Sequence, residues 1–217
     1  MTDFRQDFIR FAAAERALLF GEFVTKAGRV SPYFFNAGEF SSGAALARLC
    51  EFYAKAIDAA GIGYDMLFGS AYKGIPLAAG VAITYARAGR DVPFSFNRKE
   101  VKDHGEGGVI VGAPLQGRVL IIDDVISAGT SVRESVDIIR GLGASACAVA
   151  IALDRMERGL ADRSAVQEVE HTYGIPVVSI ATLEDLIGYL QSDRSVGQHL
   201  ASVLAYRQRY GLVDHAR

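Results

Sequence analysis

The chain has 217 residues, a length that suits one domain with an adequate hydrophobic core. Half of its residues are apolar and 22% are charged, as in ordinary globular proteins, which excludes a globally disordered chain. The 23 basic and 25 acidic residues leave a formal charge of −2. Because sequence-independent DNA binding needs a basic surface, we expect no nucleic-acid partner.

Neither a membrane segment nor a secretory signal is expected. No stretch reaches the roughly 18 consecutive apolar residues of a membrane-spanning helix, so we expect no membrane partner. The first residues, MTDFRQDFIRF, contain acids in an amphipathic pattern, unlike the basic and then apolar segments of a secretory signal. Cys50 and Cys147 lie among apolar residues, which favours buried thiols over the alternative of one disulfide. Buried thiols suit a reducing cytoplasm.

Apolar periodicity, glycines and prolines divide the chain into alternating helices and strands. In chain order the sequence predicts a helix over residues 3–18, strands at 20–26 and 33–40, a helix that follows Ser41 or Ser42 and ends at Gly61 and Gly63, a strand at 66–68, a helix from near Pro76, strands at 92–98 and 118–125, a helix at 131–142, a strand at 146–153, a helix at 164–173, a strand at 175–180, and helices near 182–191 and 195–210. Residues 99–108, KEVKDHGEGG, are charged and rich in glycine, which predicts a loop. Strands that alternate with helices predict an α/β fold with a central, mostly parallel sheet flanked by helices.

The segment VLIIDDVISAGTS, residues 119–131, is the strongest candidate for a ligand site. An apolar strand ends in Asp123 and Asp124, and the small residues 127–131 lead directly into a helix. Small residues and unpaired N–H groups at a helix N-terminus suit a phosphate, whereas the aspartates suit sugar hydroxyls or a hydrated Mg²⁺. The pattern therefore predicts a phosphorylated sugar as the ligand. An ordinary helix with a Ser or Thr N-cap is the alternative, but it leaves two adjacent acids at the strand end unexplained.

This segment resembles the phosphoribosyl-pyrophosphate motif of the type I phosphoribosyltransferases. Four further stretches, spread over essentially the whole chain, resemble the bacterial orotate phosphoribosyltransferase family: residues 20–26 with SPYFFNAG, GSAYKGIPLA, FNRKEVKDHGEGG, and ALDR ending at Arg155. The resemblance implies one domain over residues 1–217, with a small N-terminal hood built from about residues 1–40 and part of the C-terminus. It also implies transfer of the 5-phosphoribosyl group from phosphoribosyl pyrophosphate to orotate, which yields orotidine 5′-monophosphate and pyrophosphate in pyrimidine biosynthesis.

The same resemblance implies roles for individual residues. The catalytic residues would be Lys102, Asp123 and Asp124. Phosphoribosyl pyrophosphate would be bound by Lys26, Tyr72, Lys73, Arg98, Lys99, Lys102, His104, Asp123, Asp124, Val125, Ile126, Ser127, Ala128, Gly129, Thr130 and Ser131. Orotate would be bound by Phe34, Phe35, Ser127 and Arg155. Ser127 stands where the family usually has threonine, and we expect only a small effect on packing against the base.

The residue types fit these roles, although each has an alternative. Adjacent side chains of a strand face opposite sides, so one of Phe34 and Phe35 is expected in the core and the other beside the base. Arg155 suits a bidentate contact with the carboxylate of orotate, and a surface salt bridge is the alternative. Lys73 suits pyrophosphate or is an ordinary solvated lysine. Residues 98–108 are either a lid or a solvated loop.

The resemblance further implies Mg²⁺ as cofactor, held by substrate and water near Asp123 and Asp124 without a direct protein ligand. It implies a homodimer in which the lid reaches the neighbouring active site. Two other functions stay open: phosphoribosyl transfer to another base, such as a purine, and a non-catalytic sensor of phosphoribosyl pyrophosphate. The hood and Arg155 argue against the first, and retention of the 98–108 loop argues against the second.

Overall fold

The structure, a computed structural model, describes residues 3–25, 27–102, 108–159 and 162–212, and the side chains of residues 101 and 102 lie outside this description. The elements, in chain order, are α1 (Phe4–Ala14), β1 (Leu18–Val24), β2 (Val30–Phe35), η1 (Ala37–Glu39), α2 (Gly43–Ala60), β3 (Met66–Gly69), α3 (Gly74–Arg87), β4 (Phe94–Lys102), β5 (Gly108–Gly112), β6 (Arg118–Ile122), α4 (Thr130–Gly141), β7 (Ser145–Asp154), α5 (Ala165–Tyr173), β8 (Val177–Thr182), α6 (Leu183–Ser192), η2 (Gly197–His199) and α7 (Leu200–Tyr210).

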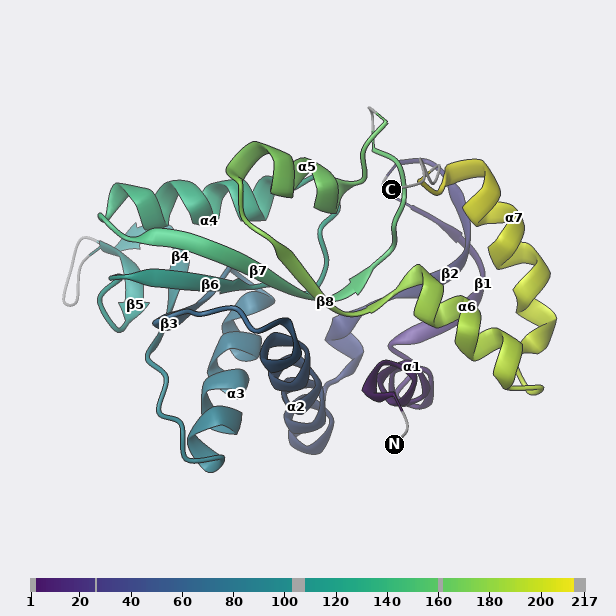
Figure 1. The fold of residues 1–217 in the computed structure, drawn as a ribbon, viewed down its shortest axis with the longest axis horizontal. Helices are drawn as coiled ribbons and strands as arrows, with labels where there is room; N and C mark the ends of the chain where they lie inside the picture. Colours follow the sequence, from purple (N-terminus) through teal and green to yellow (C-terminus); the bar gives the residue numbers. More distant parts are fainter. Residues whose placement is uncertain (1–2, 26, 103–107, 160–161, 213–217) are drawn as a thin grey trace.

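Six strands form the main sheet in the order β5-β4-β3-β6-β7-β8 (Figure 1). All neighbours are parallel except β5, which pairs antiparallel with β4. Helices α2 and α3 cover one face of the sheet, and α4 and α5 cover the other (Figure 1). The predicted α/β fold with a mostly parallel sheet between helices is confirmed.

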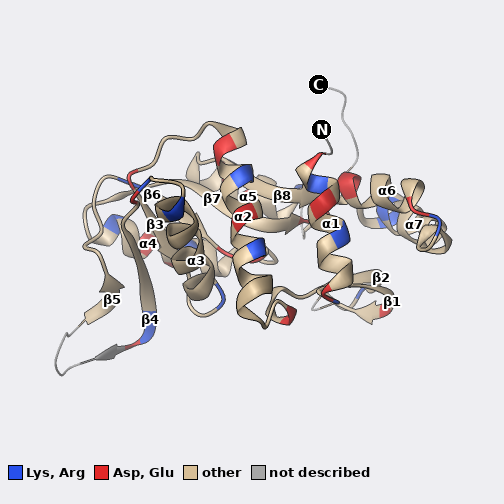
Figure 2. Cartoon of the chain, turned by 90° about the horizontal axis from the view of Figure 1, so that it is seen from below, with Lys and Arg blue, Asp and Glu red and all other residues tan. Residues whose placement is uncertain are grey.

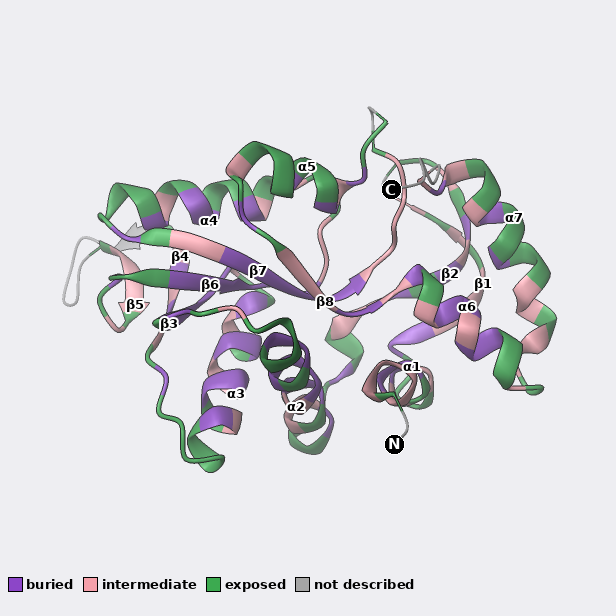
Figure 3. Cartoon of the chain, viewed as in Figure 1, coloured by how far each residue is buried: buried purple, intermediate pink, exposed green. Residues whose placement is uncertain are grey.

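Strand β6 is apolar at every core position because both faces of the sheet are covered. Leu120 and Ile122 belong to the apolar cluster under α1, α2 and α3, whereas Val119 and Ile121 belong to the cluster under α4 and α5. All four side chains are fully buried, and the middle of the sheet is buried throughout (Figure 3). Continuous apolar runs of this kind are typical of parallel strands. They place the end of β6 in the interior of the molecule.

A second, antiparallel sheet of β1 and β2, residues 18–35, lies within the segment of about residues 1–40 that is predicted to build most of the hood (Figure 1). It lies beside α7, where Tyr33 of β2 meets Tyr206 edge-on with ring centroids 6.3 Å apart. Leu18, Tyr33 and Phe35 are buried and belong to the same apolar cluster as one face of the main sheet. The hood therefore shares its core with the rest of the chain, and the C-terminal helix helps to cover it.

Two N-terminal boundaries differ from the prediction. The helix predicted over residues 3–18 ends at Ala14, because the chain from Leu18 pairs with β2 as a strand. The strand predicted over 33–40 ends at Phe35 and gives way to the short helix η1. The predicted cap of α2 is confirmed, since the Ser42 hydroxyl accepts the Ala45 amide.

The loop predicted over residues 99–108 is wrong at both ends. Strand β4 continues to Lys102, and the unpredicted strand β5 pairs with it from Gly108 to Gly112. These two strands form the edge of the sheet and extend away from the body of the molecule (Figure 2). Side chains of an edge hairpin can stay in solvent, so their charge and glycine content do not exclude a strand.

Both cysteines are free thiols, so the disulfide alternative is wrong. Cys50 is buried, and burial raises the pKa of its thiol to about 12, whereas Cys147 is half-buried. A Cβ on Gly80 of α3 would overlap the Cys50 sulfur, so the contact between α2 and α3 depends on a residue without a side chain. None of the helices in the described ranges combines the length and apolar character that crossing a membrane requires.

Leu120→Ala is expected to lower the free energy of unfolding by about 2–5 kcal/mol, because it removes fully buried methyl groups and leaves a cavity. Leu142→Ala makes the same chemical change at an exposed position and should change the free energy of unfolding by less than about 0.5 kcal/mol. Urea unfolding followed by circular dichroism measures both. Equal losses in the two variants would contradict the place of β6 in the core.

Candidate active site

Two buried carboxylates directly follow the interior strand β6. Asp123 is 5% exposed and Asp124 is 7% exposed. The Asp123 carboxylate accepts hydrogen bonds from the Ser131 hydroxyl (2.7 Å) and from the Asp124 amide (2.9 Å). The fully buried Tyr53 of α2 donates its hydroxyl to the Asp123 carbonyl oxygen (2.7 Å). These contacts fix the pair at the carboxyl end of the sheet, where ligands of such folds bind.

Lys73 supplies a positive charge beside this pair. Its Nζ atom lies 2.7 Å from the Asp124 carboxylate and 3.4 Å from the side-chain oxygen of Asn36, which follows β2 of the hood. The adjacent Gly74 allows this approach, because a Cβ there would overlap the carbonyl oxygen of Ile122. Lys73 is therefore tied to a predicted site residue, and its side chain is still half exposed.

The environment of Asp123 shifts its proton equilibrium. Burial raises the pKa of its carboxyl, the Ser131 hydrogen bond opposes this, and the charge of Asp124 raises the pKa further. The ionised carboxylate is thus held in a position that disfavours its charge. Perturbed pKa values of this kind cluster at functional sites.

Residues 127–131 lead from β6 into α4. Gly129 occupies the N-cap position with a φ of 69°, a left-handed conformation that favours glycine, and no described side chain caps the helix. The alternative of a Ser or Thr N-cap is therefore wrong. Ser127, Ala128 and Thr130 are exposed. The first N–H groups of α4 lie open beside the aspartates, as an anion site requires.

The strand β4 and the loop after β3 bring further predicted residues to this end of the sheet. The side-chain oxygen of Asn97 accepts the Ala71 amide (2.9 Å), which ties the loop to β4. Lys99 Nζ lies 5.4 Å from the ring centroid of Tyr72, a side chain that is 68% exposed. The Nη1 atom of Arg98 is buried and has no hydrogen-bond partner in the described part of the chain.

Three predicted residues cannot be placed fully. The backbone of Lys102 ends β4 and pairs with Gly108, but its side chain lies outside the described residues. Lys26 and His104 also lie outside the described residues. For Lys102, the structure therefore places the backbone at the end of β4 and no more.

The adjacent phenylalanines of β2 face opposite sides, as predicted. Phe35 is 8% exposed and contacts the rings of Phe8 and Phe40 in the core. Phe34 is 43% exposed and stacks on Phe23 with ring centroids 5.4 Å apart. The aromatic surface available to a planar base therefore belongs to Phe34, and only the backbone of Phe35 is left for a ligand.

Arg155 follows β7 and is mostly buried, so the alternative of a surface salt bridge is wrong. Glu157 and Ser31 engage two of its three guanidinium nitrogens. Burial lowers the pKa of the guanidinium, while Tyr33 and Glu157 outweigh this and raise it. In this arrangement Nη1 is the nitrogen left for a carboxylate, which does not fit the predicted bidentate contact.

Several residues that hold the site were missed from the sequence. Tyr53 lies within the helix predicted after Ser41 or Ser42, and the signal that could have found it is its hydroxyl, which needs a partner when buried. Asn97 is an amide within an apolar strand, a signal that could have found it. Asn36 contacts Lys73 and Glu157 contacts Arg29, and both partners are distant in the sequence. No local sequence pattern marks Asn36 or Glu157.

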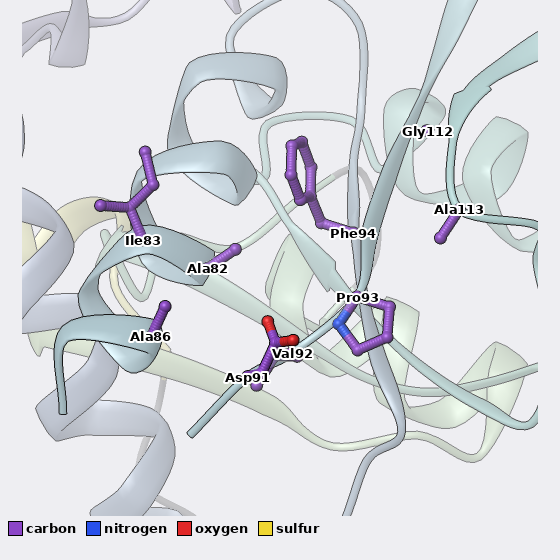
Figure 4. A pocket seen from close by; sticks show the side chains of 9 residues that line it. All are labelled: Ala82, Ile83, Ala86, Asp91, Val92, Pro93, Phe94, Gly112 and Ala113. Carbon is purple, nitrogen blue, oxygen red and sulfur yellow. The ribbon is translucent and has the colours of Figure 1, made fainter. Parts of the chain in front are cut away.

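An open apolar groove of about 390 Å³ lies elsewhere on the molecule, between the second half of α3 and the start of β4 (Figure 4). It is lined by Ala82, Ile83, Ala86, Asp91, Val92, Pro93, Phe94, Gly112 and Ala113. Phe94 begins β4, so the groove lies at the amino end of a parallel strand. The carboxylate pair lies at the opposite, carboxyl end of the parallel strands, so the groove is not part of this site.

Asp123→Asn is expected to raise the free energy of unfolding at pH 7.5, because the amide removes a buried charge and the Ser131 hydroxyl can accept its N–H. Since the folded state raises the pKa of Asp123, the wild type gains stability as the pH falls through that pKa toward the ordinary value of 3.8. The stability difference between the two proteins should therefore shrink as the pH falls.

Thermal unfolding at a series of pH values measures this difference. Asp137→Asn, at an exposed position of α4, is the matched control and should change the free energy of unfolding by less than about 0.5 kcal/mol. A destabilised Asp123→Asn at pH 7.5 would show that the carboxylate is a structural ion rather than a strained site group.

Sequence comparisons identify the family of the chain. Residues 36–179 match the family model of the phosphoribosyl transferase domain. The chain is 65% identical to the orotate phosphoribosyltransferase of Laribacter hongkongensis, over 98% of this chain and all of that protein. It is 63% identical to the orotate phosphoribosyltransferase of Chromobacterium violaceum, over 99% of this chain and all of that protein.

A solved structure supports the same assignment. The crystal structure of orotate phosphoribosyltransferase from Francisella tularensis has a TM-score of 0.85 and 40% identity, and the match covers 94% of this chain and 99% of that one. The family predicted from the sequence motifs is confirmed, together with a role in pyrimidine biosynthesis. The chain belongs to the orotate phosphoribosyltransferase family.

Proposed function

We propose that the carboxyl end of the main sheet is where this phosphoribosyltransferase joins orotate to the phosphoribosyl group. The observation that carries the proposal is the buried Asp123–Asp124 pair directly before the uncapped N-terminus of α4. An anion site and two hydroxyl acceptors lie within one short segment. A sugar phosphate offers the matching groups, a phosphate and a diol.

The two ends of phosphoribosyl pyrophosphate take different parts of this site. The 5-phosphate binds residues 125–131 through backbone N–H groups at the start of α4 and the exposed hydroxyls of Ser127 and Thr130. Ser131 contributes its backbone N–H, because its hydroxyl donates to Asp123. The carboxylates of Asp123 and Asp124 accept hydrogen bonds from the ribose hydroxyls. Asp124 exchanges its ion pair with Lys73 for this contact, which frees the ammonium for the pyrophosphate.

The pyrophosphate binds where the positive side chains of the neighbouring strands meet. Lys73 follows β3, and Arg98, Lys99 and Lys102 belong to the end of β4. The unpartnered buried nitrogen of Arg98 fits an anionic ligand, because a buried donor without a partner is costly. Tyr72 adds an exposed ring beside Lys99. Lys26 and His104 are proposed as further ligands on the family resemblance alone.

The reaction needs no covalent nucleophile from the protein. The bond between the anomeric carbon and pyrophosphate breaks through an oxocarbenium-like state, and the ring nitrogen of orotate then bonds to that carbon. Asp123 and Asp124 stabilise the positive charge that develops on the ribose. Lys102 meets the negative charge on the departing pyrophosphate, and closure of the β4–β5 hairpin excludes water.

The donor set near the aspartates fits Mg²⁺ bound chiefly by the substrate. Within the described ranges, no group of three or more His, Cys, Asp or Glu side chains is placed to hold a metal. Mg²⁺ usually keeps several waters and binds through substrate phosphates, so the ion would be held by the pyrophosphate and water near Asp123 and Asp124, without a direct protein ligand. When bound, the ion neutralises charge on the pyrophosphate.

The base lies between the hood and the end of β7. Phe34 offers its exposed ring to the flat pyrimidine, Phe35 offers its backbone, and Ser127 offers a hydroxyl from the phosphate loop. The Nη1 atom of Arg155 binds the carboxylate of orotate. A cation at this place favours a base that carries a carboxylate over a purine.

We also propose how the chain is organised. The apolar core shared by the hood and the main sheet supports one domain over residues 1–217. The β4–β5 hairpin extends away from the body (Figure 2), which supports a homodimer in which each hairpin reaches the partner's active site. The two free thiols support a reducing compartment such as the cytoplasm.

Lys102→Ala is expected to lower kcat about 100-fold or more, because a group aimed at charge developing in the transition state contributes roughly that much. The loss of orotate absorbance with Mg²⁺ and phosphoribosyl pyrophosphate measures the rate. Lys55→Ala, on the exposed face of α2, is the matched control and should keep the wild-type rate. A wild-type kcat in Lys102→Ala, with the fold intact by circular dichroism, would contradict this role.

A further inference from the structure

Glu157 holds the guanidinium of Arg155 along one edge. Its Oε1 atom accepts from Arg155 Nε at 2.7 Å and lies 2.6 Å from Arg155 Nη2. Both side chains are mostly buried, so the contact is little weakened by solvent. Charge-assisted hydrogen bonds to two nitrogens fix the orientation of the guanidinium plane as well as its position.

The hood fixes the same guanidinium from a second side. Arg155 Nη2 donates to the Ser31 hydroxyl at 2.9 Å, and that hydroxyl donates to the Tyr33 carbonyl oxygen at 2.7 Å. The Arg155 Cζ atom lies 4.2 Å from the centroid of the Tyr33 ring, which lies under the guanidinium. Nη1 takes part in none of these contacts with Glu157 and Ser31.

Glu157 also faces a second arginine, which ties it to the hood. Its Oε2 atom lies 3.5 Å from Arg29 Nη1, and Arg29 Nη2 donates to the Arg158 carbonyl oxygen at 2.8 Å. The Arg29 guanidinium also lies over the ring of Tyr210, 4.8 Å from its centroid. One carboxylate thus stands between two guanidinium groups from different parts of the fold, and without it they would lie together with no negative partner.

We infer that Glu157 is a positioning residue for orotate: it orients Arg155 so that Nη1 alone meets the carboxylate of the base. The inference rests on the proposed binding of orotate by Arg155. The pyrophosphate and ribose groups bind at the ends of β3, β4 and β6, which Glu157 does not contact. Its effect is therefore confined to the base.

The experiment is a steady-state comparison of wild type, Glu157→Gln and Glu184→Gln. Glutamine keeps the size of the side chain but accepts a weaker, uncharged hydrogen bond, so the KM for orotate is expected to rise roughly tenfold. The KM for phosphoribosyl pyrophosphate should change less than twofold. Glu184 forms an exposed ion pair with Arg207 at 2.7 Å, and its variant should leave both constants unchanged.

Two further variants keep the test decisive if Glu157→Gln unfolds. Ser31→Ala removes the second anchor of Arg155 and should also raise the KM for orotate alone. In an Arg155→Ala background, Glu157→Gln should add no further rise, because its effect passes through the guanidinium. An unchanged or lowered KM for orotate in folded Glu157→Gln, or equal rises for both substrates, would overturn the inference. If Glu157→Gln does not fold, an unchanged KM for orotate in Ser31→Ala overturns it.

Failure of the proposed function gives a different result. If Arg155→Ala leaves the KM for orotate unchanged, the proposed role of Arg155 is wrong and the inference falls with it. If wild type, Arg155→Ala and Glu157→Gln behave as expected, both stand. If Arg155→Ala raises the KM for orotate but neither Glu157→Gln nor Ser31→Ala does, the positioning role of Glu157 is overturned and the proposed function stands.

Discussion

The structure depends most on holding two adjacent carboxylates in the interior, at the end of the central strand. Asp123 and Asp124 are both almost fully buried, and two like charges so placed repel each other and lose hydration. Contacts from three elements hold the pair in place. Lys73, from the loop after β3, pairs with Asp124, whereas Ser131 of α4 and Tyr53 of α2 donate hydrogen bonds to Asp123. Each of these elements is positioned by the sheet.

The same constraint explains the glycines and the missing cap around the pair. Gly74 lets its loop reach the Ile122 carbonyl, and Gly129 turns the chain into α4 without a capping side chain. A Ser or Thr cap at that position would satisfy the N–H groups that a phosphate needs. An uncapped helix start is less stable than a capped one, and in the proposed function the 5-phosphate supplies the missing partners.

In the function we propose, the base is recognised by a different part of the molecule from the sugar phosphate. Arg155, at the end of β7, is held by Glu157 and by Ser31 of the hood, and the hood shares its core with α7. Specificity for a carboxylated base therefore depends on the packing of the N-terminal hairpin and the C-terminal helix against the sheet. Residues 125–131, the proposed phosphate site, depend on neither the hairpin nor the helix. Binding of the donor, phosphoribosyl pyrophosphate, is thereby separated from selection of the acceptor base.

The parts of this account that follow from local pattern were predictable. The apolar run into Asp123 and Asp124, the small-residue loop and the alternation of strands with helices are all visible in the sequence. The opposite facing of Phe34 and Phe35 follows from the two-residue period of a strand. The resemblance to the orotate phosphoribosyltransferase family narrowed a sugar-phosphate site to one reaction.

Features that depend on tertiary contact were not predictable. Strand β5 is short, and the charged end of its partner β4, residues 99–102, looks like a loop until the two strands pair at the edge of the sheet. The bidentate contact expected of Arg155 did not take Glu157 into account. Glu157 is held by an ion pair with Arg29, a tertiary contact that no local sequence pattern reveals.

The most direct test is a crystal structure of the chain with phosphoribosyl pyrophosphate and Mg²⁺. The account predicts ribose hydroxyls at hydrogen-bonding distance, about 2.5–3.0 Å, from the carboxylates of Asp123 and Asp124, with the 5-phosphate on the first N–H groups of α4. A 5-phosphate bound away from residues 127–131, or a ribose with no contact to either aspartate, would contradict it.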